Sequence, residues 1–268
     1  MTGPLHTLCG AHHVRLAGVE ICSLTEREVV ELAERTWAQG TGCRVVTANT
    51  DILQLAARDP VARALVDAAT AVVADGMPLV WASRILGDPL PERVTGSSLI
   101  FSLSEAAAAA DRGVYVLGGA PGVPEQAAQR LRALYPALRV VGTESPAFGF
   151  DDDPVAVADV VERVRRAAPD LVFVGMGFPR QEVLIESLVA AHPHAFYIGC
   201  GAAIPMAAGV LDRAPVLLQR AGLEWVYRLV REPGRLARRY LRNDLVFAIG
   251  LILSTSWRRG RSRGGRPR

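Results

Sequence analysis

The sequence predicts an α/β fold, with a mostly parallel sheet flanked by helices and a helical, basic appendage at the C-terminus. Short apolar runs rich in β-branched residues alternate with longer amphipathic stretches between residues 24 and 211. Several of the short runs are almost continuously apolar, as expected for parallel strands that are buried on both faces. Half of the 268 residues are apolar and 21% are charged, so the chain can bury a sizeable core and is not disordered as a whole.

Six of the apolar runs are expected to be strands. They are Arg44–Thr47, Ala71–Ala74, Gly113–Leu117, Arg139–Gly142, Asp170–Gly175 and Ala195–Gly199. The amphipathic stretches around them predict helices over Thr25–Gln39, Ile52–Ala68, Met77–Leu86, Ser97–Ala110, Val123–Leu134, Pro154–Ala167 and Pro179–Ala190. The first helix opens with Thr25 and, three residues later, Glu28, which is the pattern of a capping box. Strands that alternate with helices in this way favour a Rossmann-like sheet, in which each helix returns the chain for the next parallel strand.

The charges divide the chain into regions. The sequence contains no lysine, and residues 1–212 hold 16 Arg against 24 acidic residues, whereas residues 213–268 hold 14 Arg against 3. The formal net charge of +3 therefore combines an acidic body with a strongly basic end. We expect an α/β domain over 1–212, a helical Arg-rich segment over 213–257 and a disordered basic tail over 258–268. Such asymmetry indicates an anionic partner.

The cysteines and the apolar runs bear on the class of protein. Cys9, Cys22, Cys43 and Cys200 lie far apart without a CxxC pair, which excludes a zinc site or a disulfide framework and favours a reducing compartment. The N-terminus lacks the pattern of a signal peptide. The apolar run at residues 245–253 is too short for a bilayer core, which needs about 20 residues. We therefore expect a soluble or peripheral membrane protein.

Polar and small residues follow several predicted strands, at the edge where a doubly wound sheet binds its ligands. Thr47 and Asn49 would hold a sugar or phosphate, or simply cap the next helix. Asp75 would be a general base or a ribose or metal ligand, or else a helix cap in an Asp-Gly turn. Gly118 and Gly119 would admit a phosphate to the following helix, or only form a tight turn.

Two further polar features are open to the same alternatives. Arg93 lies in a connection, where its guanidinium would clamp a phosphate or remain solvated. The cluster Arg180–Glu182 opens a helix and would face a ligand or solvent. The sequence shows neither metal-ligand spacing nor a nucleophile motif. The residues alone therefore predict an α/β protein that binds a phosphorylated ligand.

In this order, these stretches resemble the WecG/TagA/CpsF family of bacterial glycosyltransferases. The matching segments cover roughly residues 14–243 and are VTANTDILQLAARDP, VVADGMPLVWASRILGDPLPERVTGSSL, YVLGGAPGVPEQAAQRL, PDLVFVGMGFPRQE and RAPVLLQRAGLEWVYRLVREPGRLARRYL. The resemblance implies an inverting transfer of a sugar from a UDP-sugar to a polyprenyl-diphosphate-linked saccharide, without metal or other cofactor. It also implies a cytoplasmic protein, peripheral on the inner face of the membrane and active in teichoic acid or other surface polysaccharide synthesis.

The resemblance also assigns roles to residues of this chain. Asp75 would be the general base, and Arg93 would contact phosphate or the donor sugar. Gln181 would orient a substrate, and the basic appendage would close over the site and bind an anionic membrane. The expected substrate-binding positions are Thr47, Asn49, Arg93, Gly118, Gly119, Gln181, Arg228, Arg235 and Arg238. The last three would neutralise the leaving diphosphate in place of a metal.

Two departures from the family pattern affect the donor. Ser98 stands where relatives often have Asp, and Ile204-Pro205-Met206 stands where they have a Phe-Asp-Phe-like stretch. The donor sugar would be N-acetylmannosamine or, with an altered pocket wall, a different hexose or a uronic acid.

Other functions and a self-association surface also have some support. A nucleotide-dependent oxidoreductase would use the Gly118-Gly119 turn, although the sequence lacks GxGxxG there. An adaptor built on the basic tail would bind lipid rather than nucleic acid, because few aromatics accompany the arginines. An apolar stripe would mediate either formation of a homo-oligomer or membrane contact, and it consists of Leu223, Val226, Tyr227 and Val230.

Overall fold

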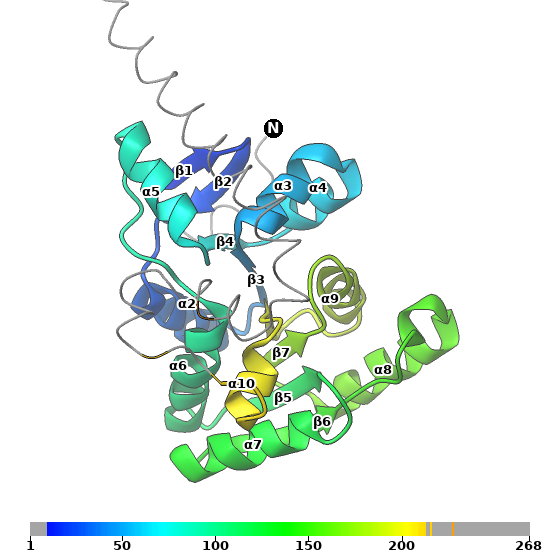
Figure 1. The fold of residues 1–268 in the computed structure, drawn as a ribbon. Helices are drawn as coiled ribbons and strands as arrows, with labels where there is room; N and C mark the ends of the chain where they lie inside the picture. The colour runs from blue at the N-terminus through cyan, green and yellow to red at the C-terminus, as the bar shows by residue number, and fades with distance from the viewer. Residues whose placement is uncertain (1–9, 213–214, 216–226, 228–268) are drawn as a thin grey trace, which may run out of the picture.

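The computed structural model describes residues 10–212 together with 215 and 227, and it confirms the predicted fold class. Six strands form one sheet in the order β4-β3-β8-β7-β5-β6, and every neighbouring pair is parallel (Figure 1). The strands are β3 (Cys43–Ala48), β4 (Ala71–Ala74), β5 (Gly113–Gly118), β6 (Arg139–Glu144), β7 (Leu171–Gly175) and β8 (Phe196–Gly199). Apart from residues 215 and 227, the predictions for 213–268 lie outside the described part of the chain.

The helices agree with the sequence except that one predicted helix is divided at a proline and that the short helix Ala203–Ala208 was not predicted. They are α2 (Glu26–Gln39), α3 (Thr50–Arg58), α4 (Pro60–Asp67), α5 (Met77–Leu86), α6 (Gly96–Ala109), α7 (Val123–Leu134), α8 (Pro154–Ala167), α9 (Arg180–Ala191) and α10 (Ala203–Ala208), with a 3₁₀ turn, η1 (Phe150–Asp152). The predicted capping box of α2 is confirmed, since Thr25 and Glu28 each accept a hydrogen bond from the other's backbone N–H.

The single helix expected over Ile52–Ala68 is wrong, because two helices, α3 and α4, occupy this region. Pro60 disfavours helical backbone at the residue before it, and Asp59 is extended with φ −118° and ψ 116°. The Asp59 carboxylate then caps α4 by accepting a hydrogen bond from the Val61 N–H at 2.9 Å. The proline therefore ends one helix and begins the next.

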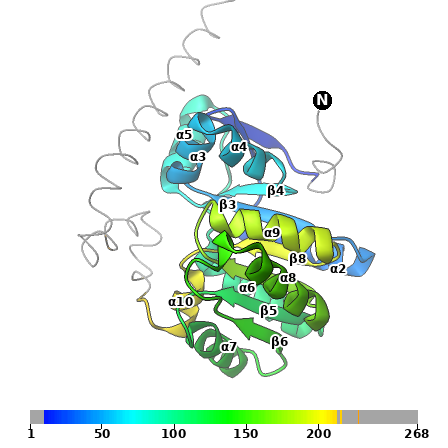
Figure 2. The same ribbon diagram turned by 90° about the vertical axis from the view of Figure 1, so that its right-hand side faces the viewer.

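Three apolar clusters hold the layers together. On one face of the sheet, α2, α6, α7 and α10 pack against alternate residues of the strands. On the other face, α8 and α9 cover β5, β7 and β8, as Figure 2 shows. Next to them, α3, α5 and a hairpin of β1 (His13–Leu16) and β2 (Val19–Cys22) cover β3 and β4.

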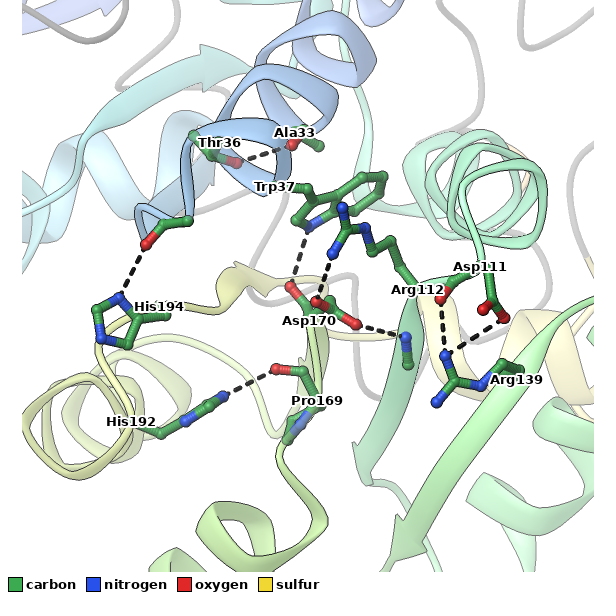
Figure 3. Close-up of polar contacts among 12 residues, drawn as sticks. Ala33, Thr36, Trp37, Asp111, Arg112, Arg139, Pro169, Asp170, His192 and His194 are labelled. Atoms are coloured by element: carbon green, nitrogen blue, oxygen red, sulfur yellow. Dashed lines mark hydrogen bonds and ion pairs between the residues drawn. The ribbon is translucent and has the colours of Figure 1, made fainter.

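Asp170 joins several elements at the amino-terminal edge of the sheet (Figure 3). Its Oδ2 accepts a hydrogen bond from the Gly113 N–H at 2.7 Å, and its Oδ1 accepts one from Arg112 Nη1 at 3.3 Å. Its backbone carbonyl accepts a hydrogen bond from the indole N–H of Trp37 at 3.0 Å. Through these bonds Asp170 connects α2, β5 and β7 at the edge opposite to the carboxyl ends of the strands.

Replacing Asp170 with Ala is expected to lower the free energy of unfolding by about 2–3 kcal/mol, because the Gly113 N–H and the Arg112 guanidinium both lose a charged acceptor. Urea denaturation followed by circular dichroism measures the change. Asp111→Asn is the matched control, since asparagine tolerates the left-handed backbone of Asp111, whose carboxylate is 81% exposed and pairs with Arg139 on the surface. Its loss should cost at most about 1 kcal/mol. Equal losses in the two variants would contradict the proposed role of Asp170.

Candidate active site

Asp75 and Arg93 lie at the carboxyl end of β4, beside the end of β3. The Asp75 N–H donates to the Ala48 carbonyl at 2.7 Å. The Val94 N–H donates to the Ala74 carbonyl at 2.9 Å, which holds the segment that carries Arg93 against the end of the strand. Both Asp75 and Arg93 are half-buried. A carboxylate-bearing residue and a guanidinium-bearing residue therefore share one corner of the sheet, where ligands bind in folds of this type.

The structure also decides which residue caps the helix after β4. The N-cap of α5 is Gly76, not Asp75, and the helix has a proline, Pro78, in its first turn. A proline has no N–H, so the start of this helix has fewer donors to satisfy. The alternative in which Asp75 is the helix cap is therefore wrong. Its role as general base stays a prediction.

Thr47 and Asn49 lie at the end of β3 and both have structural partners. Thr47 is buried, and its hydroxyl donates to the Gly199 carbonyl at 3.2 Å, which joins β3 to β8. Asn49 is the N-cap of α3, and its Oδ1 accepts a hydrogen bond from the Ile52 N–H at 3.1 Å. The capping alternative is thus confirmed for Asn49. Contact of either residue with a substrate stays a prediction.

Gly118 and Gly119 end β5 at the same edge of the sheet, separated from β3 by β8 and β7. Both have positive φ angles, 109° and 95°, which non-glycine residues rarely adopt. A Cβ atom on Gly118 would lie 2.7 Å from the Gly175 carbonyl oxygen, so only glycine fits where β5 passes β7. This geometry supports the tight-turn interpretation of both glycines. Close approach of a nucleotide stays a prediction.

Gln181 lies in the first turn of α9 and connects the loops that follow β7 and β8. It is 4% exposed. Its Oε1 accepts hydrogen bonds from the N–H groups of Gly177 at 3.1 Å and Gly201 at 3.3 Å. Its Nε2 donates to Glu182 Oε1 at 3.2 Å. Both ends of the amide thus bond to the protein itself, and the predicted orientation of a substrate by Gln181 is not tested by this geometry.

An ion pair that the sequence interpretation missed lies beneath these loops. Arg44 on β3 and Glu182 on α9 are 5% and 0% exposed, and Arg44 Nε donates to Glu182 Oε2 at 3.2 Å. Burial raises the pKa of Glu182, and Arg44 opposes this shift by stabilising the carboxylate. One signal in the sequence could have indicated that Arg44 has a buried acidic partner, although not which residue it is, because an arginine inside an apolar strand needs such a partner.

The remaining polar groups near this edge have structural roles. Cys200 follows β8, and burial, with a smaller effect of the nearby Glu182 charge, raises the pKa of its thiol to about 12. The thiol is therefore protonated at neutral pH and is a poor nucleophile. Asp153 caps α8 by accepting a hydrogen bond from the Val155 N–H at 2.9 Å. Asp151, two residues earlier, forms an ion pair with Arg180.

The two departures from the family pattern fall at different depths. Ile204 is fully buried, and a Cβ on Gly175 would lie 2.6 Å from its Cδ1, so Ile204 packs directly behind the end of β7. Ser98 is half-buried in the first turn of α6, where its N–H donates to Thr95 Oγ1 at 3.1 Å. The predicted positions Arg228, Arg235 and Arg238 lie outside the described residues.

Two features are absent from the residues that the structure describes. None of the helices seen in the structure has the length and apolar character required to cross a membrane. Within residues 10–212, no group of three or more His, Cys, Asp or Glu side chains is arranged to hold a metal ion.

Comparisons with known proteins agree with the resemblance seen in the motifs. Residues 14–262 match the model of a family described as "Glycosyl transferase WecG/TagA/CpsF family". The chain is also similar to a protein of Bacillus spizizenii (strain ATCC 23059 / NRRL B-14472 / W23) named N-acetylglucosaminyldiphosphoundecaprenol N-acetyl-beta-D-mannosaminyltransferase. The two are 32% identical over 200 residues, which cover 75% of this chain and 76% of the relative. With its parallel sheet and with the family motifs at the carboxyl ends of the strands, the chain belongs to the WecG/TagA/CpsF family and is a glycosyltransferase.

Proposed function

We propose that this glycosyltransferase moves N-acetylmannosamine from a UDP-sugar to a polyprenyl-diphosphate-linked N-acetylglucosamine, with inversion at the anomeric carbon and without a metal ion. The observation that carries the proposal is the similarity over 200 residues to a relative whose name states this sugar and this acceptor. The position of Asp75 beside Arg93 at the carboxyl end of β4 supports it, because one carboxylate and a phosphate-binding cation are what an inverting transfer requires.

In the proposed reaction, Asp75 acts on the acceptor. Its carboxylate takes the proton from the acceptor hydroxyl as that oxygen attacks the anomeric carbon of the donor. The bond from this carbon to the UDP oxygen breaks at the same time, and its electron pair leaves with the diphosphate. Attack from the face opposite to UDP inverts the anomeric configuration, so a single carboxylate is sufficient.

The leaving diphosphate needs positive charge in the absence of a metal. Arg93 supplies one guanidinium at the corner that holds Asp75. The chain then enters α6, whose first turn carries the hydroxyls of Ser97 and Ser98 and whose N-terminal dipole favours an anion. Arg228, Arg235 and Arg238 would add further positive charge. These groups stabilise the charge that develops on the diphosphate as the glycosidic bond breaks.

The place of action follows from the substrate. A polyprenyl diphosphate is anchored in the membrane, and the end of the chain carries 14 Arg against 3 acidic residues over 213–268. Basic segments bind anionic lipid with about 1 kcal/mol for each arginine near the surface. We infer a peripheral enzyme on the cytoplasmic face of the membrane, where UDP-sugars and the lipid-linked acceptor meet.

The test is a panel of donors offered with a short-chain polyprenyl-diphosphate-linked N-acetylglucosamine. UDP-N-acetylmannosamine is expected to give the disaccharide product in mass spectrometry, and proton NMR should show an inverted anomeric centre. Transfer from a UDP-hexose or UDP-uronic acid alone would overturn the donor assignment. Failure of every donor with this acceptor would refute the proposed pair of substrates. Undiminished transfer after treatment with EDTA is expected, and its loss would contradict the metal-independent mechanism.

A further inference from the structure

We propose that the buried Glu182, whose charge Arg44 balances, is a positioning residue: its accepting oxygen sets the orientation of the Gln181 amide, which in turn fixes the loops after β7 and β8 at the sugar-transfer site. The link to catalysis rests on the proposed function, whereas the effect on the loops does not depend on it. Neither Arg44 nor Glu182 needs to touch a substrate for this role.

The burial of the pair calls for an explanation. Among the buried polar side chains of the described residues, only Arg44 and Glu182 carry charges. Removing two charges from water is costly. A protein with well-packed apolar residues in place of a buried ion pair is often as stable or more stable. A gain in stability therefore does not explain why this pair is buried. The explanation lies in the hydrogen bonds that the pair makes to other polar groups.

The Glu182 carboxylate faces two different partners. Oε2 accepts a hydrogen bond from Arg44 Nε at 3.2 Å, and Oε1 accepts one from Gln181 Nε2 at 3.2 Å. A carboxylate can only accept, so it forces the NH₂ end of the Gln181 amide toward itself. The oxygen end must then face the N–H groups of Gly177 and Gly201, at 3.1 and 3.3 Å. An amide turned the other way would set a donor against both N–H groups and lose the two bonds.

The space around the pair is restricted by β8. A Cβ on Gly199 would lie 2.2 Å from Glu182 Oε1 and 2.3 Å from Gln181 Nε2, so the end of β8 accommodates these side chains only as glycine. The Gly199 carbonyl also accepts the Thr47 hydroxyl at 3.2 Å. The same short strand end thus lies against Glu182 and Gln181 and also bonds to Thr47 of β3. The network reaches β3, whose neighbour β4 leads to Asp75.

Two double variants separate orientation of the amide from loss of a buried charge. Arg44→Met with Glu182→Gln keeps an oxygen that accepts from Gln181 Nε2, whereas Arg44→Met with Glu182→Leu keeps none. Both remove the same charged pair. Glu186→Gln is the matched single-site control, because Glu186 lies on the same helix and contacts Arg44 Nη1 at 3.4 Å but is 49% exposed. The melting temperature of each variant establishes that it is folded.

The direct readout is amide hydrogen exchange in the peptides that contain Gly177 and Gly201. We expect the Leu variant to exchange about tenfold faster there than wild type, with kcat/KM for transfer about tenfold lower, the effect of losing a hydrogen bond to a charged group. The Gln double variant and Glu186→Gln should stay within about threefold of wild type in both measurements.

The possible results separate this inference from the proposed function. Equal exchange in the two folded double variants would overturn the positioning role. The positioning role in catalysis would also be refuted if wild type transfers the sugar and the Leu variant exchanges faster at these loops with an unchanged kcat/KM. Faster exchange only in the Leu variant, in a protein that transfers no sugar from any donor, would support control of the loops and refute the proposed function instead.

Discussion

Asp75→Asn is expected to abolish sugar transfer, with kcat/KM about 100- to 10,000-fold below wild type. An amide of the same size cannot take the proton from the acceptor hydroxyl, so the attack on the anomeric carbon loses its base. Donor binding is expected to survive, because the variant retains the shape of the site and the cation Arg93. Radiolabelled transfer measures the first effect, and calorimetric titration with UDP measures the second.

The control for Asp75→Asn is Asp67→Asn on α4, which removes a carboxylate that is 51% exposed and pairs with Arg63. This control should transfer sugar at the wild-type rate and melt at nearly the same temperature. Full turnover by folded Asp75→Asn would refute the general-base assignment. A parallel loss of UDP affinity would instead assign Asp75 to donor binding.

The strands were predictable because buried parallel strands have a strong sequence signal. Ala71–Ala74 matches β4 completely, and the other five predicted strands differ from the structure by one or two residues at one or both ends. The hairpin of His13–Leu16 and Val19–Cys22 was missed, since two four-residue strands give little periodicity. The break between α3 and α4 was missed because the amphipathic pattern continues across Pro60. The prediction did not take into account that Pro60 disfavours helical backbone at Asp59.

The corner of the site was predictable from topology, but the contacts of its residues were not. Parallel strands place their carboxyl ends at one edge, so Thr47 and Asp75 were expected to lie together. A sequence does not show which partner a buried polar group finds. Gln181, predicted to orient a substrate, bonds with Gly177, Gly201 and Glu182, and none of these contacts was predicted. The pairing of Arg44 with Glu182 joins residues 138 positions apart, which no local pattern reveals.

The arginines of the basic end are expected to fall into two groups with separable effects. In the first variant, glutamine replaces every arginine of the predicted tail 258–268, namely Arg258, Arg259, Arg261, Arg263, Arg266 and Arg268. Each lost arginine should weaken binding to vesicles with anionic lipid by about 1 kcal/mol. Turnover of a short, water-soluble acceptor should not change, because only attachment to the surface is affected.

The second variant replaces Arg228, Arg235 and Arg238 with glutamine. Here turnover should fall at least about 100-fold with the soluble acceptor as well as with vesicles, because removing even one group that stabilises transition-state charge costs that much. Vesicle sedimentation at low and high salt measures binding, since screening weakens attraction to the surface. A tail variant that loses turnover of the soluble acceptor would place those arginines in the reaction. Wild-type turnover by the second variant would mean that these three arginines do not stabilise the leaving diphosphate.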